Sequence, residues 1–359
     1  MKFDFPFNSI ITAEIERLLD TASNKLPAIF TFDDYYKRLT DYSVRGKMVR
    51  SNLVILSWYA YQTKSIELTP EVITLAAIQE LSESGLLLQD DVMDDDMLRR
   101  GKLTMHLQYR ELAQVKNLKV SPHSARKFGE AWATTLGNIL YFYLFGLLAD
   151  LPTHAETKLS LIDLYSNELA ITGSGQLGDL AAGFGIVDPT QLEVGEINRQ
   201  KTAHYTICLP MLAGAILAGQ SKEELAAITT VGETIGEIFQ LTDDRLDLFS
   251  SSEVSGKTQA SDVKSGKKTM LYFFTVEGLQ KKPYELLEFN SLYGKADLQL
   301  TEIERVQQLV KISGGYERSE ALIGELAARA RQQLTKLSIS DTSRQWFYSF
   351  IHFLLTRKH

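Results

Sequence analysis

Residues 69–96 of the chain read TPEVITLAAIQELSESGLLLQDDVMDDD, and this stretch decides the class of fold. Thr69 offers a helix N-cap, and Pro70 suits the first helical position because its missing N–H would have no helical partner there. The residues that follow are apolar on nearly every side of the helix, which predicts burial at the centre of the protein. The helix ends in an aspartate run, Asp90-Asp91-Val92-Met93-Asp94-Asp95-Asp96. The stretch therefore predicts a buried central helix that carries carboxylates at its C-terminal end.

The rest of the chain carries the same helical signals. Ser or Thr three residues before Glu, the pattern of a capping box, occurs at Thr153, Ser221 and Thr301. Apolar residues between these positions recur at helical spacing, and the alternation typical of β-strands is scarce. Pro210 should kink its helix. Since no Pro-, Gly- or Ser-rich linker divides the chain, we predict an all-α protein with a single domain over residues 1–359.

Composition excludes several classes of function. The chain has 359 residues, a formal net charge of −7 and 44% hydrophobic residues, which is typical of soluble globular proteins. An acidic chain lacks the excess of basic residues that binding to nucleic acid requires. The single cysteine, Cys208, excludes an intrachain disulfide and a thiolate zinc site and fits a reducing cytosol. Residues 207–219 are nearly apolar but too short to cross a bilayer, so we expect a cytoplasmic protein without a transmembrane segment.

Two aspartate clusters point to a divalent metal. Asp90 and Asp94 lie on one helical face, where carboxylates ~5.5 Å apart repel by about 3 kcal/mol at an effective dielectric near 20. On an exposed loop such a cluster would be ordinary solvated charge, but at the end of a buried helix it requires a cation. A second apolar helix ends with Asp243, Asp244 and Asp247. Oxygen-only ligands favour Mg²⁺, which completes its coordination with water and substrate phosphates, so the clusters predict a polyphosphate ligand.

Basic residues lie next to the same segments. Taken singly, each is more typical of a solvated surface charge. Together they supply the guanidinium and ammonium groups that bind phosphate oxygens. These residues are Lys47, Arg50, Arg99, Arg100, Lys102, Lys201, Lys257, Lys267 and Lys268.

The ordered set of motifs resembles the trans-isoprenyl diphosphate synthases, also called polyprenyl synthetases, and among them the geranylgeranyl diphosphate synthases. The resemblance covers roughly residues 40–275. The first aspartate-rich motif is similar to residues 90–94 and continues into Arg99-Arg100-Gly101-Lys102. Residues 175–179, Gly-Gln-Leu-Gly-Asp, and the pair Lys201-Thr202 resemble two further family segments. Residues 239–247 resemble the second aspartate-rich motif.

This resemblance implies a bundle of long helices around a central cavity and an enzyme that joins isopentenyl diphosphate head to tail to an allylic diphosphate. It also implies a homodimer and three Mg²⁺ ions. By analogy, the metal residues are Asp90, Asp91, Asp94, Asp179, Asp243, Asp244 and Asp247. The residues expected to act in catalysis besides Asp90, Asp94 and Asp243 are Arg99, Lys201, Thr202, Gln240 and Lys257. Those expected to bind substrate are Lys47, Arg50, Glu83, Arg100, Gln176 and Lys267.

The sequence departs from the family pattern in the segment expected to bind isopentenyl diphosphate. Glu83, seven residues before Asp90, stands where the family has His or Gln, and Met48 stands where it has a basic residue. An acidic group at position 83 would repel a diphosphate unless it pairs with Lys47 or Arg50 or is protonated.

Product length depends on the helix beneath Asp90, along which the family's product grows. Short-chain enzymes often have an aromatic residue four or five positions before this aspartate, where the present chain has Leu86 and Gly85. With Ser82 one turn earlier, the sequence predicts a product of C20 or longer, unless the aromatic residues at 141–145 close the channel from the side.

Two other functions remain open. A terpene cyclase shares the first aspartate motif but normally has a different second metal motif. A non-catalytic partner subunit of a two-component synthase tends to lack intact aspartate motifs, and only Glu83 favours it here. His106, His204 and Cys208 are interpreted as packing residues.

Overall fold

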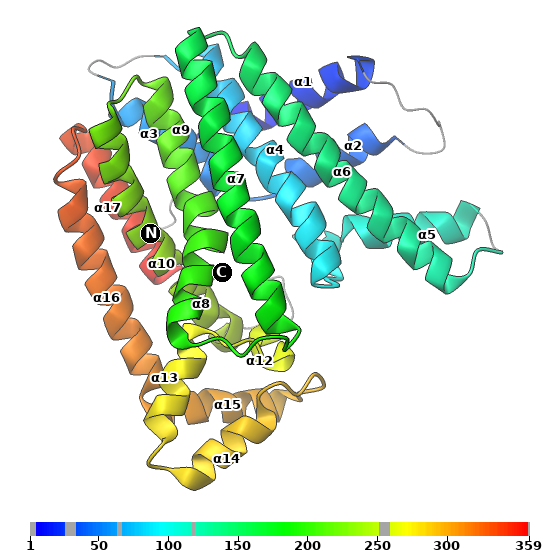
Figure 1. The fold of residues 1–359 in the computed structure, drawn as a ribbon, viewed down its shortest axis with the longest axis vertical. Helices are drawn as coiled ribbons and strands as arrows, with labels where there is room; N and C mark the ends of the chain where they lie inside the picture. The colour runs from blue at the N-terminus through cyan, green and yellow to red at the C-terminus, as the bar shows by residue number, and fades with distance from the viewer. Residues whose placement is uncertain (1–4, 26–33, 63–66, 117–118, 251–258, 358–359) are drawn as a thin grey trace. The chain divides into compact units, whose positions relative to one another are not determined.

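The computed structural model describes residues 5–25, 34–62, 67–116, 119–250 and 259–357, and this part of the chain is all-α apart from one short hairpin (Figure 1). It divides into two compact units. The first unit consists of Asp4–Asp163 and Ala213–Gly219, and most of the second consists of Leu164–Leu212 and Gln220–His359. We call them the α4 unit and the α10 unit after the helix around which each is built.

The α4 unit surrounds the helix predicted from residues 69–96. It contains α1 (Asn8–Lys25), α2 (Tyr35–Ser43), α3 (Val49–Ala60), α4 (Pro70–Met93), β1 (Leu98–Arg99), β2 (Lys102–Leu103), α5 (Met105–Lys116) and α6 (Pro122–Asp150). Helix α4 contacts α1, α2, α3, α5 and α6, and Figure 1 shows α4 between α3 and α6. Every residue from Leu75 to Gly85 is buried. The predicted central helix is therefore confirmed within its unit, and it buries polar side chains as well as apolar ones.

The α10 unit has the same plan around a second long helix. Its elements are α8 (Gln191–Asn198), the π-helical segment η1 (Arg199–Cys208), α10 (Lys222–Phe249), α12 (Ser261–Ser265), α13 (Met270–Leu279), α14 (Pro283–Leu292), α15 (Leu300–Ser313), α16 (Gly315–Leu334) and α17 (Asp341–Thr356). Helix α10 contacts η1, α12, α13, α15, α16 and α17. Two further helices, α7 (Ala155–Gly183) and α9 (Leu209–Leu217), have residues in both units.

Glycines on α10 allow η1 to pack closely against it. A Cβ on Gly236 would lie 2.3 Å from the Cβ of Ala203, which is closer than real Cβ contacts. The π-helical segment η1 ends at Cys208, and Pro210 is the second residue of the α-helix α9 that follows. Pro210 therefore lies next to the change from π-helix to α-helix, and the kink expected there stays a prediction. The close approach places η1, with its Lys201-Thr202 pair, against the face of α10.

The helix starts expected from capping patterns were partly right. Ser221 caps α10 by accepting a hydrogen bond from the Glu224 amide at 3.3 Å. The start predicted at Thr301 is wrong, because α15 begins at Leu300 with a capping box between Gln299 and Glu302. The pattern beginning at Thr153 lies just before α7, which begins at Ala155.

Helix α6 is long and apolar enough, by length and composition, to cross a membrane, and it is the one such helix in the described ranges. About a third of its most apolar window is buried. The buried residues recur every three or four positions along one face, which packs on α4 and α5. This is the pattern of an amphipathic helix in a globular protein. Its buried residues are Ala125, Gly129, Ala133, Leu136, Gly137, Leu140, Leu144 and Leu148.

Candidate active site

The first aspartate cluster lies where α4 ends. The backbone amide of Asp94 donates to the carbonyl of Asp90 at 2.9 Å, so these two residues are one helical turn apart as predicted. The Asp90 side chain is 24% exposed and Asp94 is exposed. Both carboxylates therefore lie where a metal ion and a ligand have access to them.

Asp91 has a different environment from its neighbours. It is fully buried, and its two carboxylate oxygens accept hydrogen bonds from Tyr42 Oη at 2.8 Å and Arg99 Nε at 2.6 Å. Burial raises the pKa of Asp91 more than these two partners lower it. Arg99 also contacts Asp96 at 2.7 Å and lies 3.6 Å from Asp90. Because the Arg99 side chain is only 10% exposed, it fixes the end of α4 and the loop that follows.

The segment expected to hold isopentenyl diphosphate contains a buried ion cluster. Glu83 Oε1 accepts from Arg50 Nη1 at 2.8 Å and from Arg100 Nη2 at 3.1 Å. Gly46 makes room for this arrangement, since a Cβ there would lie 2.5 Å from the Arg100 guanidinium carbon. Lys47 is exposed on the preceding loop. Glu83 thus pairs with Arg50, one of the partners that the sequence suggested, and with Arg100, which it did not suggest.

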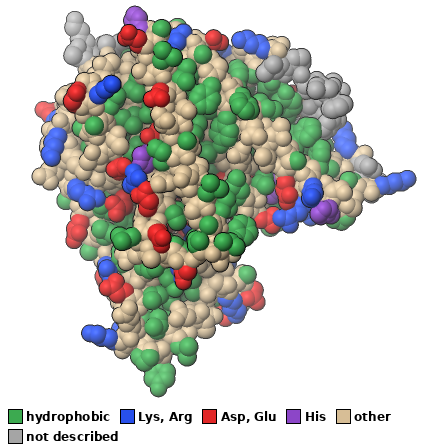
Figure 2. Space-filling model, in the orientation of Figure 1, with side chains coloured by type: hydrophobic (Ala, Val, Ile, Leu, Met, Phe, Trp, Pro, Cys, Tyr) green, Lys and Arg blue, Asp and Glu red, His purple; other side chains and the backbone are tan. Residues whose placement is uncertain are grey.

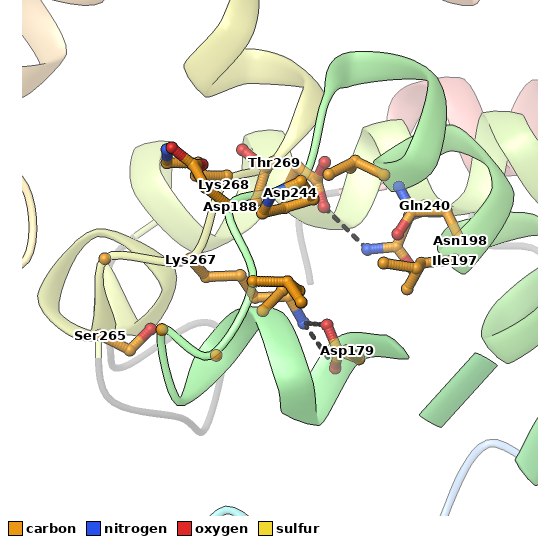
Figure 3. A pocket seen from close by; sticks show the side chains of 17 residues that line it. Asp179, Asp188, Ile197, Asn198, Gln240, Asp244, Ser265, Lys267, Lys268 and Thr269 are labelled. Carbon is orange, nitrogen blue, oxygen red and sulfur yellow. Dashed lines mark hydrogen bonds and ion pairs between the residues drawn. The ribbon is translucent and has the colours of Figure 1, made fainter. Parts of the chain in front are cut away.

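The second aspartate cluster lies on the last turns of α10. Asp243 Oδ1 accepts from Arg357 Nη2 at 2.5 Å, and Asp244 Oδ1 accepts from Gln240 Nε2 at 2.7 Å (Figure 3). Asp247 accepts from the backbone amides of Ser261 and Asp262 at 3.1 Å, so it caps the short helix α12. Each expected metal residue of this cluster therefore has a protein partner.

Asp179 forms ion pairs with two lysines of the α10 unit. Asp179 lies 2.6 Å from Lys201 Nζ and 2.9 Å from Lys267 Nζ. Burial tends to raise the pKa of Asp179, but the two ammonium groups outweigh it and the pKa is lowered. The carboxylates of Asp179, Asp244 and Asp262 correspondingly raise the pKa of Lys267 against the effect of burial.

A cavity of about 380 Å³ lies beside this cluster within the α10 unit (Figure 3). Asp179, Gln240, Asp244 and Lys267 line it together with residues that sequence reasoning missed, among them Asn198 and Asp188. Next to this group, Thr202 Oγ1 donates to Gln240 Oε1 at 2.8 Å. The structure thus brings Asp179, Gln240, Asp244 and Lys267 together, whereas Asp243 and Asp247 do not line this cavity. Gln176 lies half-buried on α7, three residues before Asp179, and Lys257 lies outside the described residues.

Arg357 is the clearest site residue that the sequence did not assign. Besides Asp243, its guanidinium donates to the Phe239 carbonyl at 2.9 Å and stacks over the Phe239 ring at 4.2 Å. Arg245 fixes the same end of α17 by donating to the Leu355 carbonyl at 3.3 Å. The only signal in the sequence was the basic end Arg357-Lys358.

His204 is more than a packing residue. Its Nδ1 lies 2.9 Å from Glu168, its Nε2 lies 3.3 Å from Glu233, and Arg199 contacts the same ring nitrogen at 2.8 Å. The hydrogen bond to Glu168 raises the pKa of His204 against the effect of burial. His106 and Cys208 are buried, as a packing role requires.

The donor set fits a hard metal ion that binds together with a substrate. In the part of the chain that the structure describes, no three His, Cys, Asp or Glu side chains are gathered closely enough to hold a metal by themselves. Mg²⁺ usually takes only one or two carboxylates and fills its octahedron with water and phosphate oxygens. Asp244 Oδ2 is buried without a hydrogen-bond partner among the described residues, and burial beside Asp262 raises the pKa of this carboxyl group. A cation beside Asp244 would give this oxygen a partner and would favour the ionised form of the carboxyl group.

Comparison with known proteins identifies the family. Residues 33–312 match the sequence profile of the family described as Polyprenyl synthetase. The chain belongs to the polyprenyl synthetase family. The farnesyl diphosphate synthase of Bacillus subtilis is 30% identical over 295 residues, which cover 79% of this chain and 90% of that protein. The short chain isoprenyl diphosphate synthase of Methanothermobacter thermautotrophicus is 29% identical over 316 residues, covering 88% of this chain and 87% of the relative.

The fold is also similar to that of solved structures. A geranylgeranyl pyrophosphate synthase from Corynebacterium glutamicum, solved with isoprenyl diphosphate and magnesium, has a TM-score of 0.88 with this chain. The two are 24% identical, and the match covers 100% of each chain. The predicted isoprenoid-synthase class of all-α fold is therefore confirmed.

Proposed function

We propose that this polyprenyl synthetase is a Mg²⁺-dependent trans-prenyltransferase that condenses isopentenyl diphosphate with an allylic diphosphate. One observation carries the proposal: the central helix of each unit ends in an aspartate cluster, and each cluster has basic residues close by. Metal-bound diphosphate and positively charged side chains are what ionisation of an allylic diphosphate requires, because negative charge builds up on the departing group. The product would be a trans-polyprenyl diphosphate.

Asp90, Asp94 and Asp243 are the direct metal ligands of the proposal, with three Mg²⁺ ions in total as the family resemblance implies. Bound there, Mg²⁺ neutralises negative charge on the diphosphate groups. Asp91, Asp179 and Asp247 would act around these ligands, since protein groups bind both oxygens of each carboxylate. Asp244 would face an ion with its Oδ2, which is buried without a hydrogen-bond partner among the described residues.

The other site residues would bind the substrates or position neighbouring side chains. Lys201 and Lys267 would bind diphosphate oxygens, and their shared partner Asp179 keeps both ammonium groups directed to one place. Thr202 and Gln240, held together by their hydrogen bond, would present oxygen dipoles to the allylic cation. Arg99 is assigned a positioning role, because its guanidinium is taken up by aspartates. Gln176 and Lys257 stay predicted substrate and diphosphate contacts.

The acceptor would bind without metal to Lys47, Arg50 and Arg100 in the α4 unit. Arg50 and Arg100 lie within hydrogen-bond reach of one shared oxygen atom, Glu83 Oε1, which supports the proposal that both guanidinium groups bind one anion. The released diphosphate would accept the proton that the acceptor loses, so the proposal needs no side-chain base.

We further propose a homodimer in which the whole chain forms one cytoplasmic isoprenoid-synthase domain. The outer face of α6 carries apolar side chains that the α4 unit does not cover: Phe142 is 79% exposed, and hydrophobic atoms gather over the path of α6 in Figure 2. Exposed apolar patches of this kind mark protein interfaces. Phe142→Glu should then convert a dimer into a monomer in light scattering coupled to size-exclusion chromatography.

The function is tested by incubating the purified chain with Mg²⁺, isopentenyl diphosphate and one allylic diphosphate at a time, followed by mass spectrometry of the products. A longer trans-prenyl diphosphate that forms with Mg²⁺ and is absent with excess chelator is the expected result, with C20 or longer as the predicted length. Hydrocarbon products would favour a terpene cyclase instead. Product that forms only after a second synthase subunit is added would favour a partner subunit.

A further inference from the structure

Segment η1, which carries Lys201 and Thr202, is a π-helix that runs over Arg199–Cys208. Hydrogen bonds of the π-helical kind usually occur only as a single turn within an α-helix, and such turns are frequent at functional sites. Because this backbone form is rare, contacts from neighbouring helices are needed to hold η1 in it. Two neighbours, α7 and α10, supply these contacts.

Glycines let α7 and α10 approach the backbone of η1 directly. A Cβ on Gly175 of α7 would lie 2.5 Å from the backbone nitrogen of Lys201, and a Cβ on Gly236 of α10 would lie 2.3 Å from the Cβ of Ala203. Both distances are shorter than real Cβ contacts, so η1 lies closer to each helix than a larger residue would allow. The two approaches flank Thr202 along the chain. Since packed interiors are nearly incompressible, a small shift of η1 between these helices moves the Lys201-Thr202 pair with it.

His204 connects η1 with the same two helices. Its side chain is buried, and so is that of its partner Glu168 on α7. The His204 Nδ1 atom lies 2.9 Å from Glu168 Oε2, and because a carboxylate oxygen can only accept, Nδ1 donates and the orientation of the ring is fixed. On the other side of the ring, Nε2 lies 3.3 Å from Glu233 Oε1 on α10, and Arg199 Nη1 lies 2.8 Å from each of these two atoms. All four residues belong to the α10 unit.

From this geometry we infer that His204 is a positioning residue for prenyl transfer, which holds η1 at one fixed place between α7 and α10. The glycines only make room, whereas His204 supplies directed bonds to both helices. The inference rests on the proposed function, which assigns Lys201 and Thr202 to the allylic substrate. Lys201 Nζ lies 2.6 Å from Asp179 on α7, and Thr202 Oγ1 donates to Gln240 on α10 at 2.8 Å. The site thus combines side chains from three helical segments, and His204 fixes the middle one without bonding to the reacting atoms.

Loss of the His204 bonds should affect the catalytic step and not acceptor binding. The allylic cation is proposed to face Thr202 and Gln240, whereas isopentenyl diphosphate is proposed to bind in the α4 unit. A displacement of about 1 Å at a catalytic group can cost about a hundredfold in rate. The long stem of Lys201 can follow a small shift of η1, but the short side chain of Thr202 cannot, so the loss should fall on Thr202.

The experiment is a double-mutant cycle on the full-length chain with Mg²⁺, isopentenyl diphosphate and the allylic diphosphate that the wild type uses best. Rates of the wild type, His204→Gln, Thr202→Val and the double variant are compared per folded molecule, with the folded fraction taken from near-ultraviolet circular dichroism. We expect His204→Gln to lower kcat by at least about tenfold and to leave the KM of isopentenyl diphosphate within about twofold. In the Thr202→Val background the same change should lower kcat by less than about threefold, because both changes remove one interaction. Equal fold-losses in the two backgrounds, or an unchanged kcat in His204→Gln, would overturn the inference.

Glu168→Gln and Glu168→Ala are the matched pair of controls. The first keeps an oxygen that accepts from His204 Nδ1 and should keep kcat within about threefold, whereas the second leaves Nδ1 without this acceptor and should reproduce the loss of His204→Gln. Equal kcat values in these two variants would contradict the role of His204. If Glu168→Ala does not fold, the double-mutant cycle alone decides. The wild type separates the two levels: product with an unchanged kcat in His204→Gln refutes only the positioning role, whereas no product with any allylic diphosphate refutes the proposed function and the inference with it.

Discussion

Tyr141 on α6 should limit the length of the product. A Cβ on Gly85 would lie 3.0 Å from Tyr141 Cε1 and 3.3 Å from two further ring carbons, so the ring covers the place on α4 where the sequence predicts open space. Gly85 precedes Asp90 by five residues, which is about 7.5 Å along the helix axis. The aromatic group that the sequence could not place therefore lies beside the predicted floor of the channel.

Truncation of the Tyr141 ring should change the product length by an amount that can be measured. Tyr141→Ala removes six carbons and one oxygen, slightly more than the five carbons of one isoprene unit, so the main product should lengthen by one C5 unit. The Tyr141 hydroxyl is buried without a hydrogen-bond partner in the described part of the chain, so its loss breaks no hydrogen bond. Removing this half-buried ring costs at most about 3 kcal/mol of unfolding free energy, less than the roughly 5 to 15 kcal/mol of a typical domain.

The opposite change should shorten the product. Gly85→Phe adds a ring where even a Cβ presses on Tyr141, and such overpacking costs roughly 1 to 3 kcal/mol. Tyr143→Ala is the control, because Tyr143 lies on the same helix but its hydroxyl donates to the Leu18 carbonyl on α1 at 2.8 Å. Products are compared by mass spectrometry at matched turnover. If Tyr141→Ala and Tyr143→Ala give the same product length as the wild type, Tyr141 does not form the floor and the reasoning is wrong.

Three further predictions follow from the α10 unit and the first aspartate cluster. Asp90→Ala and Asp243→Ala should each lower kcat by at least about a hundredfold while the protein still folds, since the lost metal ligand stabilises charge that develops in the transition state; unchanged turnover in either variant would contradict the metal assignment. Arg357→Gln should strengthen Mn²⁺ binding in the absence of substrate, measured by electron paramagnetic resonance, because the guanidinium no longer competes for Asp243; equal affinity would show that the ion pair does not hinder metal binding. Glu168 raises the pKa of His204, so protonated His204 stabilises the folded state. This stabilisation is complete at pH values below the ordinary pKa of 6.5 and is lost as pH rises through the pKa of His204 in the folded protein. His204→Gln should therefore lower the unfolding free energy by about 1 to 2 kcal/mol at pH 5.5 and by less at pH 9 in urea titrations, whereas an equal loss at both values would refute the linkage.

Sequence alone determined the features that depend on local geometry. The helix from Pro70 and the one-turn spacing of Asp90 and Asp94 follow from helical periodicity and from the backbone of proline, and both are present in the structure. Capping patterns did not determine the start of a helix where two such patterns overlap. The capping patterns at Gln299 and Thr301 compete within a few residues, and α15 begins at Leu300, three residues before the buried Ile303.

Tertiary structure alone decided how the charges of the site are paired. Asp91 and Asp94 belong to the same motif, yet only Asp91 is buried against Tyr42, a residue 49 positions earlier in the chain. The Glu83–Arg50 pair is separated by 33 residues and the Asp243–Arg357 pair by 114. No spacing rule connects such positions, because these contacts arise only when whole helices pack together. Sequence therefore gives the residue types that can bind metal and diphosphate, whereas packing determines which carboxylates are accessible and which are already neutralised by an arginine.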